Sequence, residues 1–347
     1  MRTLFSLILI LALLLSGCGV TRQPQAEAPS GELTIHYIDV GQADCALIQC
    51  GGEYALIDGG NREDGSLVVS YLEQQGVQEL AAVICTHAHE DHVGGLPAVL
   101  AVYPTAAVYA PTSTYSSNIF DKFLYYTDQQ GLEVTIPGPG DTLSLGTSTA
   151  TFLGPVQSYP DPNNTSLVVS WVFGDTRFLF TGDMETEAET DLVDFWGDEN
   201  PILLADVLKV GHHGSNTSTG YRFLNAVQPD YGVISVGKDN SYGHPHAEPL
   251  ERLGQADVTL LRTDELGHIL ASSDGTAITF TWQNQSAEPD RVTPGEAAAM
   301  TYIGNKNSHK LHAPDCGSLP KEENRVYFDH YLDAIDAGYS PCGSCLG

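Results

Sequence analysis

Three histidines and an aspartate stand within six consecutive residues, His87-Ala-His-Glu-Asp-His92. Neutral imidazole nitrogens and carboxylate oxygens are the ligands that zinc, manganese and iron accept in proteins. The spacing supplies two pairs, His87 with His89 and Asp91 with His92, and each pair can bind one of two neighbouring ions. A polar loop rarely carries four ligand-type side chains in six positions, so this segment predicts a metal site.

Further side chains of the same types lie in the second half of the chain. Asp183 ends one apolar run, the neighbours His212 and His213 end another, and His244 stands between a glycine and a proline. Donors at the ends of buried strands can complete a metal site, although turn caps use the same positions. These residues are the candidates for the remaining ligands and for a proton donor.

The surrounding elements have to bring these residues together. The apolar run 81–86 predicts a buried strand, and Gly94-Gly95 predicts the turn into a helix. The runs 46–49 and 54–57 flank a Gly-Gly turn, which indicates a hairpin. Helices are expected between such strands at about 67–75, 94–103, 185–195 and 217–227. This alternation requires a mixed α/β fold.

Three aspartates fall at the ends or turns of the first strands, beside glycines that let the backbone approach closely. They are Asp39, Asp44 and Asp58. A carboxylate placed there can orient a metal-binding histidine from behind. A turn cap explains each of them equally well, so both roles remain open.

The order and spacing of these motifs resemble the metallo-β-lactamase fold, and specifically the hydrolase domain of ComEC-type competence proteins. The matching segments are 39–44, 57–60, 87–92, 163–167, 181–183, 208–215 and 242–245. The resemblance covers residues 32–283. It implies an αβ/βα sandwich of four layers, two sheets faced by helices, with metals at the sheet edges.

The resemblance also implies roles for the site residues. Asp183 would bridge two metals, and one of His212 and His213 would complete the second metal while the other faces substrate. Asp91 would bind or orient the nucleophile. His244 would stabilise developing charge in the transition state or bind phosphate. We therefore expect Asp91 and His244 to be catalytic.

One position departs from the broader fold. No histidine occurs between His92 and His212, where many members carry another metal ligand. The corresponding region holds Asn164 and Ser166, and an amide is a weak ligand. We therefore expect two divalent metals, Zn²⁺ or Mn²⁺, with an incompletely ligated and labile first site.

Four polar residues are expected to contact substrate: Asn164, Ser166, Ser215 and Lys209. Helix capping explains Ser215 equally well, and an ordinary surface position explains Lys209. The expected chemistry is hydrolysis by metal-activated hydroxide without a covalent enzyme intermediate, because bound divalent ions lower the pKa of water to about 7.

The preferred function is a surface-anchored phosphodiesterase or nuclease linked to extracellular DNA processing or uptake. One alternative is a hydrolase of another exported ester, such as a cell-wall phosphoester or a lactone. A third is a non-catalytic DNA-uptake or binding lipoprotein. The sequence leaves the oligomeric state open.

The N-terminus indicates export. Residues 1–17 contain a single charge and an apolar stretch too short to count as a membrane span, which is typical of a signal peptide. The sequence before Cys18 resembles a bacterial lipobox, which implies lipidation of that cysteine, and 18–31 is expected to be a flexible tether. This places the protein on the outer face of the bacterial cytoplasmic membrane. Ordinary secretion, with Cys18 incidental, is the alternative.

The chain carries 44 acidic and 15 basic residues, a formal net charge of −29. Such charge favours solubility and repels polyanions at long range. Phosphate contacts dominate nucleic-acid affinity, and the sequence shows no basic cluster. DNA as a partner is therefore compatible with the chain but not required by it.

The C-terminal part has its own metal pattern. After a polar linker at 284–298, residues 299–347 contain His312, Cys316, Cys342 and Cys345. One nitrogen and three sulfurs make a complete tetrahedral zinc set, which would stabilise a segment too short for an ample core. The segment resembles the small Ada-like metal-binding domain and predicts an α+β module with one structural Zn²⁺. A disulfide, or His309 as a ligand, is the alternative.

Overall fold

The computed structural model describes residues 31–291 and, in the C-terminal part, 302–313, 316–328, 334–335, 337–343 and 345–346. Cys18 and the expected signal peptide at 1–17 lie outside these residues. So do all but one residue of the expected tether and positions 292–298 of the expected linker.

The first sheet has eight strands in the order β15-β14-β1-β2-β3-β4-β5-β6. The strands are Ile278–Trp282, Ile269–Ser273, Leu33–Tyr37, Ala46–Cys50, Glu53–Ile57, Ala82–Ile84, Val108–Tyr109 and Val134–Thr135, in the same order. β3 to β6 run parallel to one another. The expected hairpin is β2–β3, whose turn residues Gly51 and Gly52 both have positive φ (62° and 84°), as a tight hairpin turn requires.

The second sheet also has eight strands, in the order β16-β13-β12-β11-β10-β9-β8-β7. They are Asp290–Arg291, Thr259–Arg262, Tyr231–Ile234, Val207–Lys209, Thr176–Phe180, Val168–Phe173, Ser148–Gly154 and Thr142–Leu145. β10 to β13 are parallel. Large buried side chains such as Trp171 and Phe152 fill the space between the two sheets, together with Tyr37 from the first.

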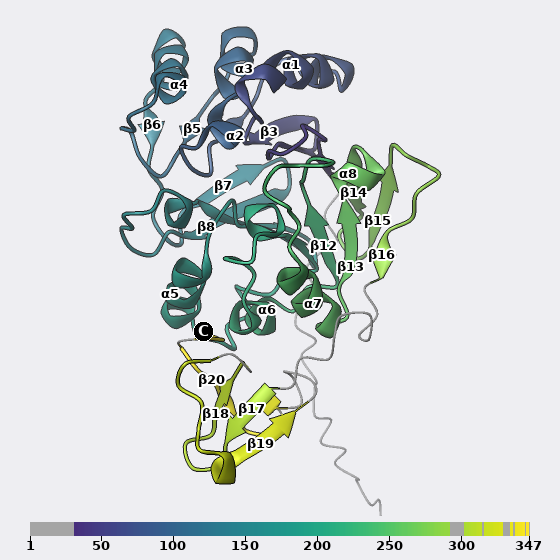
Figure 1. Cartoon of the computed structure of the whole chain (residues 1–347). Coiled ribbons are helices and arrows are strands. Elements are labelled where there is room, and N and C mark those ends of the chain that lie inside the picture. Colours follow the sequence, from purple (N-terminus) through teal and green to yellow (C-terminus); the bar gives the residue numbers. More distant parts are fainter. Residues whose placement is uncertain are drawn as a thin grey trace, which may run out of the picture.

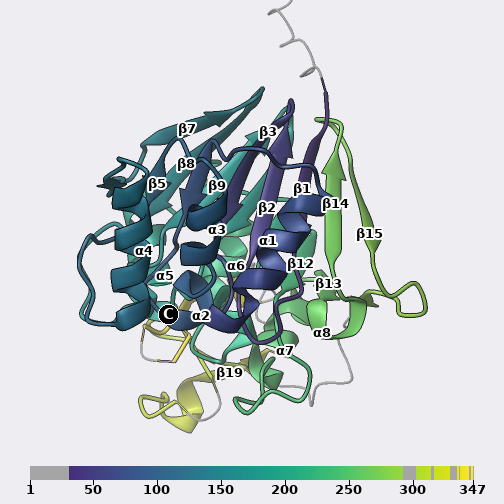
Figure 2. The ribbon, with the colours of Figure 1, turned by 90° about the horizontal axis from the view of Figure 1, so that it is seen from above.

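Helices cover the outer face of each sheet (Figures 1 and 2). Those on the first sheet are α1 (Gly65–Gln74), α3 (Leu96–Val102) and α4 (Asn118–Gln129), and those on the second are α5 (Thr186–Trp196), α6 (Tyr221–Val227) and α7 (Ala247–Gln255). Two short helices, α2 (Glu90–Val93) and α8 (Thr263–Leu266), also belong to the described part of the sandwich. The predicted αβ/βα four-layer sandwich is confirmed.

The C-terminal module has a four-stranded sheet in the order β19-β17-β18-β20. The strands are Arg325–Phe328, Tyr302–Asn305, Lys310–His312 and Ser340–Pro341. The module lies against the α5–α6 side of the sandwich (Figure 1). Tyr302 is fully buried there, its hydroxyl bonded to that of Tyr221 and donating to Gln255 Oε1 at 3.1 Å.

Two further findings bear on the sequence expectations. Within the described part of the chain, no helix has the length and apolar character needed to cross a bilayer. The six cysteines of that part are all free of disulfides. The disulfide alternative for the C-terminal module is therefore not realised.

Candidate metal centre

The candidate site lies where the parallel strands of both sheets end. The histidine segment follows β4, Asp58 follows β3, and Asp183 and the histidine pair follow β10 and β11. Because carboxyl ends of parallel strands meet at one edge, side chains distant in sequence converge there. Gly182 has φ of 51°, and a Cβ at this residue would lie 2.8 Å from Ser166 Oγ, so the turn that presents Asp183 needs glycine.

The first ligand group contains His87 and His89. Nε2 of His87 lies 3.1 Å from Nδ1 of His89 and 3.8 Å from Oδ2 of Asp183. Burial, reinforced by the neighbouring His92, lowers the pKa of His87 well below its usual value. The imidazole is therefore neutral, as a metal ligand must be.

The second group brings Asp91, His92, Asp183 and His213 together, with one ligand atom of each within 4.8 Å of all the others. Nε2 of His92 lies 3.2 Å from Oδ1 of Asp183, and Nε2 of His213 lies 3.3 Å from Oδ2 of Asp91. Asp183 belongs to both groups, the position that the sequence prediction gave it.

Two buried atoms of the second group test whether a cation fits. Nε2 of His92 and Oδ1 of Asp183 lie 3.2 Å apart without hydrogen-bond geometry, and neither atom has another hydrogen-bond partner among the described residues. Burial alone would lower the pKa of His92, but Asp183, Asp58 and Asp91 raise it well above its usual value. The carboxylates thus create a strong demand for positive charge at this point. These residues fit divalent metal ions.

Buried acceptors fix the tautomers of both histidines in the second group. Nδ1 of His92 donates to Oδ2 of Asp58 at 2.8 Å, and Nδ1 of His213 donates to the carbonyl of Ser235 at 2.9 Å. In each ring the Nε2 lone pair is therefore left for a metal, the arrangement found around metal-binding histidines. Asp58 accordingly lies in the supporting position expected for it.

The structure distinguishes the two neighbouring histidines. Both have left-handed backbone conformations, with φ of 49° at His212 and 53° at His213, and they point to different partners. His213 is buried within the second group. The side chain of His212 is 21% exposed, with its Nε2 3.7 Å from Oδ2 of Asp183 and its Nδ1 3.4 Å from Glu185. Geometry assigns His213 to the second metal and leaves His212 at the open side.

Asp44 and Lys209 lie behind His213. Oδ1 of Asp44 is 3.3 Å from Nδ1 of His213, and Oδ2 is 2.7 Å from the Lys209 ammonium. Burial would raise the pKa of Asp44, but Lys209 and His213 hold it below its usual value. Asp44 thus supports a metal ligand, as expected. The prediction for Lys209 was wrong, because its side chain is buried and paired rather than placed on the surface to meet a phosphate.

Other expected contacts also differ. Oγ of Ser166 accepts from the Asp183 N–H at 3.0 Å, and Oδ1 of Asn164 accepts from the Glu185 N–H at 3.0 Å. Both side chains are buried, so they hold the strand end in place and do not present themselves to substrate.

Two remaining residues act within their own loops. Oγ of the buried Ser215 accepts from the Thr217 N–H at 3.4 Å, a turn inside its own loop rather than a helix N-cap, because α6 begins after Gly220. Asp39 accepts from the Gly41 N–H at 3.1 Å. No described hydrogen bond or ion pair joins its carboxylate to a site histidine, so its expected support of a ligand is not met.

His244 lies at the mouth of the site, its ring centroid 5.7 Å from that of His212. Gln42 Nε2 donates to its Nδ1 at 3.2 Å, and this amide orientation is fixed because Oε1 accepts from the Gly237 N–H. Burial, then the nearby His213 and His212, lower the pKa of His244 to about 4. The ring is neutral at pH 7 with its proton on Nε2, so it is a hydrogen-bond donor.

Sequence reasoning missed several supporting residues. Thr86 donates from its hydroxyl to Asp58 at 2.6 Å, and Gln42 orients His244. The carbonyl of Ser235 fixes the tautomer of His213. The sequence held one signal of a buried pair that supports the site. Lys209 lies inside an apolar strand, where a lysine is rarely tolerated unless it is paired.

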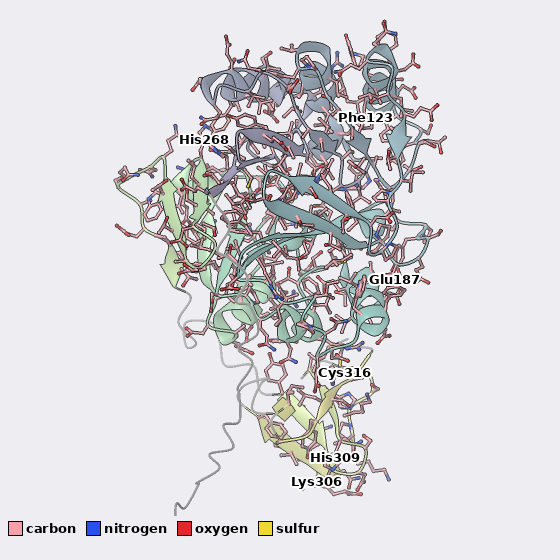
Figure 3. All side chains as sticks on the ribbon, turned by 180° about the vertical axis from the view of Figure 1, so that it is seen from behind. Phe123, Glu187, His268, Lys306, His309 and Cys316 are labelled. Carbon is pink, nitrogen blue, oxygen red and sulfur yellow. The ribbon has the colours of Figure 1, made fainter. Side chains whose placement is uncertain are left out.

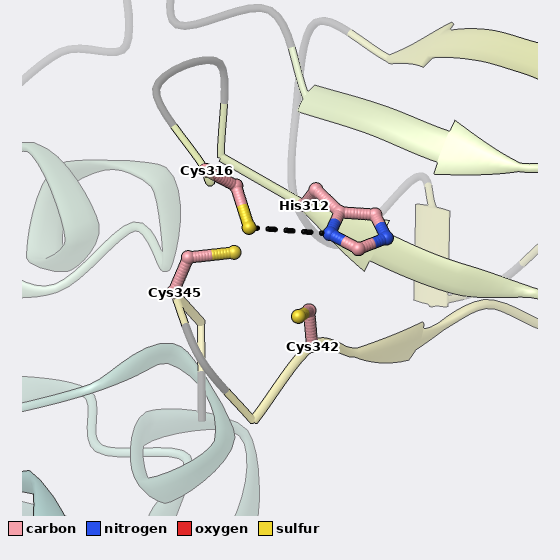
Figure 4. Close-up of side chains that lie close together, drawn as sticks. All are labelled: His312, Cys316, Cys342 and Cys345. Atoms are coloured by element: carbon pink, nitrogen blue, oxygen red, sulfur yellow. Dashed lines mark hydrogen bonds between the residues drawn. The ribbon is translucent and has the colours of Figure 1, made fainter. Parts of the chain in front are cut away.

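The C-terminal module holds a second site. Ligand atoms of His312, Cys316, Cys342 and Cys345 all lie within 4.8 Å of one another, and the side chains point toward a common centre (Figure 4). Nδ1 of His312 is 3.3 Å from Sγ of Cys316. His309 lies apart from Cys316 of the cluster (Figure 3). Its ring stacks on Tyr339, with 5.0 Å between ring centroids.

The fold and these two sites define a metal-binding α/β hydrolase with an added zinc module. Residues 38–238 match the family model of the metallo-beta-lactamase superfamily, and residues 295–346 match that of the metal binding domain of Ada. The chain therefore belongs to the metallo-beta-lactamase superfamily. Its fold implies divalent metals in the first site, and the Ada-like cysteine cluster implies zinc in the second.

The curated relatives of this chain include competence proteins. ComE operon protein 3 of Bacillus subtilis is 33% identical over 261 residues, which are 69% of this chain and 33% of the relative. Competence protein ComA of Neisseria gonorrhoeae is 31% identical over 256 residues, 74% of this chain and 34% of the relative. The chain thus spans about a third of the length of these relatives. The metallo-beta-lactamase fold protein YhfI of Bacillus subtilis is 16% identical, with a TM-score of 0.42 over 62% of this chain and 92% of that one.

Proposed function

We propose that this chain is a metal-dependent phosphodiesterase that cleaves an extracellular phosphodiester such as DNA. The observation that carries the proposal is the position of Asp183, which lies 3.8 Å from His87 in one ligand group and 3.2 Å from His92 in the other. A shared carboxylate between two such groups is the arrangement of a two-metal hydrolytic site.

The ligand set determines what bound metals would contribute. Divalent cations held by the two groups would lower the pKa of coordinated water to about 7 and would neutralise charge on a phosphoryl oxygen. The chain's own residues supply positioning: Asp91, whose side chain is 32% exposed, faces the open side and can orient the nucleophile. The Nε2–H of His244 can donate to charge that develops on the substrate.

The relatives and the N-terminus support a role outside the cell. The name of one relative, competence protein ComA, connects that protein with competence, and we extend that connection to this chain as a proposal. The apolar stretch at 4–15 and Cys18 support export and lipid attachment to the outer face of the cytoplasmic membrane. A Cys18→Ala variant should move from the membrane fraction to the medium or periplasm, whereas continued sedimentation with membranes would oppose the lipid anchor.

The activity is tested with purified chain loaded with Mn²⁺ or Zn²⁺. Substrates are bis-p-nitrophenyl phosphate, single- and double-stranded DNA, a carboxylic ester and a lactone. We expect diester cleavage that is lost in Asp183→Asn and retained in Asp198→Asn, since Asp198 pairs with Arg222 at the surface. Ester or lactone turnover alone would favour another exported ester as substrate. No turnover with both metals bound would favour a binding lipoprotein.

A further inference from the structure

Tyr242 presents an aromatic ring to solvent next to the metal centre. Its side chain is 69% exposed, the largest fraction among the big apolar side chains of the described residues. The ring stacks on His244 with 5.7 Å between centroids and 25° between planes. His244 is in turn nearly parallel to His213, at 6.3 Å and 25°. A series of rings therefore connects the second ligand group to the surface.

The loop that carries Tyr242 is held firmly. Oδ1 of Asn240 accepts from the N–H groups of Tyr242 and His244 at 3.1 and 3.0 Å. Its Nδ2 donates to the carbonyls of Gly237 and His244 at 2.9 and 2.6 Å. These four bonds from one side chain fix the backbone on both sides of the tyrosine. The ring is thus pre-organised in its exposed position, which favours binding.

A second tyrosine lies beside the other ligand group. The ring of Tyr115 is 6.2 Å from that of His89, at 71° between planes. It is half-buried against the helices of the first sheet. Aromatic side chains therefore lie next to both ligand groups.

Few basic side chains near the site are free to contact a phosphate backbone. Lys209 is paired with Asp44, and Arg262 is paired with Asp264 at 2.7 Å and Glu265 at 3.2 Å. Lys238, exposed on the loop that also carries His244, is the cation without an ion pair among the described residues that line the pocket there. The whole chain has a net charge of −29. Because phosphate contacts require free lysines and arginines and Lys238 alone can supply few of them, affinity for a nucleic acid has to come mainly from bound metals and from its bases. Stacking on aromatic side chains is the sequence-tolerant way to bind a base.

We propose that Tyr242, supported by His244, stacks an unpaired nucleobase next to the scissile phosphodiester, so that single-stranded nucleic acid is the preferred substrate. This inference rests on the proposed phosphodiesterase function and specifies its substrate. A duplex hides the faces of its bases within the stack, so only unpaired bases or ends can occupy this platform.

The test uses metal-loaded full-length chain and two single-stranded oligodeoxynucleotides, one intact and one with abasic sites throughout. We expect wild type to prefer the intact strand about tenfold in kcat/KM, from the usual contribution of one stacked base. Tyr242→Ala should lose that preference through a higher KM with little change in kcat, and Tyr242→Phe should keep it. Tyr125→Ala is the matched control, because Tyr125 is 56% exposed on α4 away from the site.

Binding measured by fluorescence anisotropy provides a readout independent of turnover. Wild type should bind the intact strand more tightly than the abasic one, with a weak dependence on salt because few cations are available. An unchanged intact-to-abasic ratio in a folded Tyr242→Ala variant would overturn the stacking platform. If wild type cleaves no phosphodiester but binds the intact strand through Tyr242, the proposed function fails and the platform stands.

Discussion

The ammonium of Lys209 lies 2.7 Å from Oδ2 of Asp44, and both side chains are buried beneath the histidine loop. The other oxygen of Asp44 lies 3.3 Å from Nδ1 of His213. A ligand of the second metal is thus supported from behind by a carboxylate whose charge a lysine stabilises. Such supporting residues orient the ligand and raise its basicity.

Replacing Lys209 by methionine should weaken binding of the second metal. The substitution keeps most of the stem volume but leaves Asp44 buried without its ammonium partner. We expect the affinity of the second site to fall about 10- to 100-fold, measured by competition with a chromophoric chelator. Lys238→Met is the matched control, since Lys238 is exposed. Equal affinities in the two variants would contradict this role of Lys209.

Ser166 should contribute to stability rather than to substrate binding. Its hydroxyl oxygen accepts from the buried Asp183 N–H at 3.0 Å. In Ser166→Ala that N–H loses its partner, so we expect the free energy of unfolding to fall by about 1–3 kcal/mol. Urea unfolding measures this loss, and the exposed Ser144→Ala on β7 should change little. A raised KM with unchanged stability in Ser166→Ala would instead support the expectation that Ser166 contacts substrate.

The C-terminal ligand set is tested by comparing two histidines. His312→Ala removes a ligand from the cysteine cluster, whereas His309→Ala removes a ring that only stacks on Tyr339. Zinc bound per chain should fall by one ion in His312→Ala and stay constant in His309→Ala, as measured by elemental analysis. The reverse result would exchange the roles of the two histidines.

His36 should make the protein less stable in acid. The side chain is buried against Tyr71, and burial, then His268, lowers its pKa from 6.5 to about 4. As the pH falls, the His36 imidazole is therefore protonated near pH 6.5 in the unfolded chain but only near pH 4 in the native state. Above pH 6.5, His36 contributes about 3 kcal/mol to the free energy of unfolding, and this contribution is lost as the pH falls through 4.

The His36→Gln variant removes this titration. Between pH 6.5 and 4 its free energy of unfolding should fall less steeply than that of wild type, as urea titrations at each pH would show. Parallel curves for the two proteins would mean that His36 titrates normally in the native state.

Local sequence patterns were sufficient to predict much of the candidate site. The histidine segment, the Gly51-Gly52 hairpin and the spacing of the tail ligands are properties of neighbouring residues, and short-range geometry fixes them. The sandwich followed from the alternation of strands and helices, together with the family resemblance.

The features that the sequence did not predict depend on contacts between residues that are far apart in the chain. Lys209 is buried only because Asp44 from the other sheet meets it, and Ser166 reaches Asp183 only because β9 and β10 are neighbours. The order of His212 and His213 depends on two consecutive positive φ angles. Histidine, like asparagine and aspartate, adopts such angles more often than most residues, but this statistical preference does not say which of two adjacent histidines points into the site.

The central claim is that two metals share Asp183. Anomalous diffraction from crystals of the full chain grown with Zn²⁺ tests it directly, and the cysteine cluster serves as an internal control for metal loading. We predict one peak within the tail cluster and two at the sandwich site, on either side of the Asp183 carboxylate. A filled tail cluster with no peak, or a single peak, at Asp183 would contradict the two-metal account.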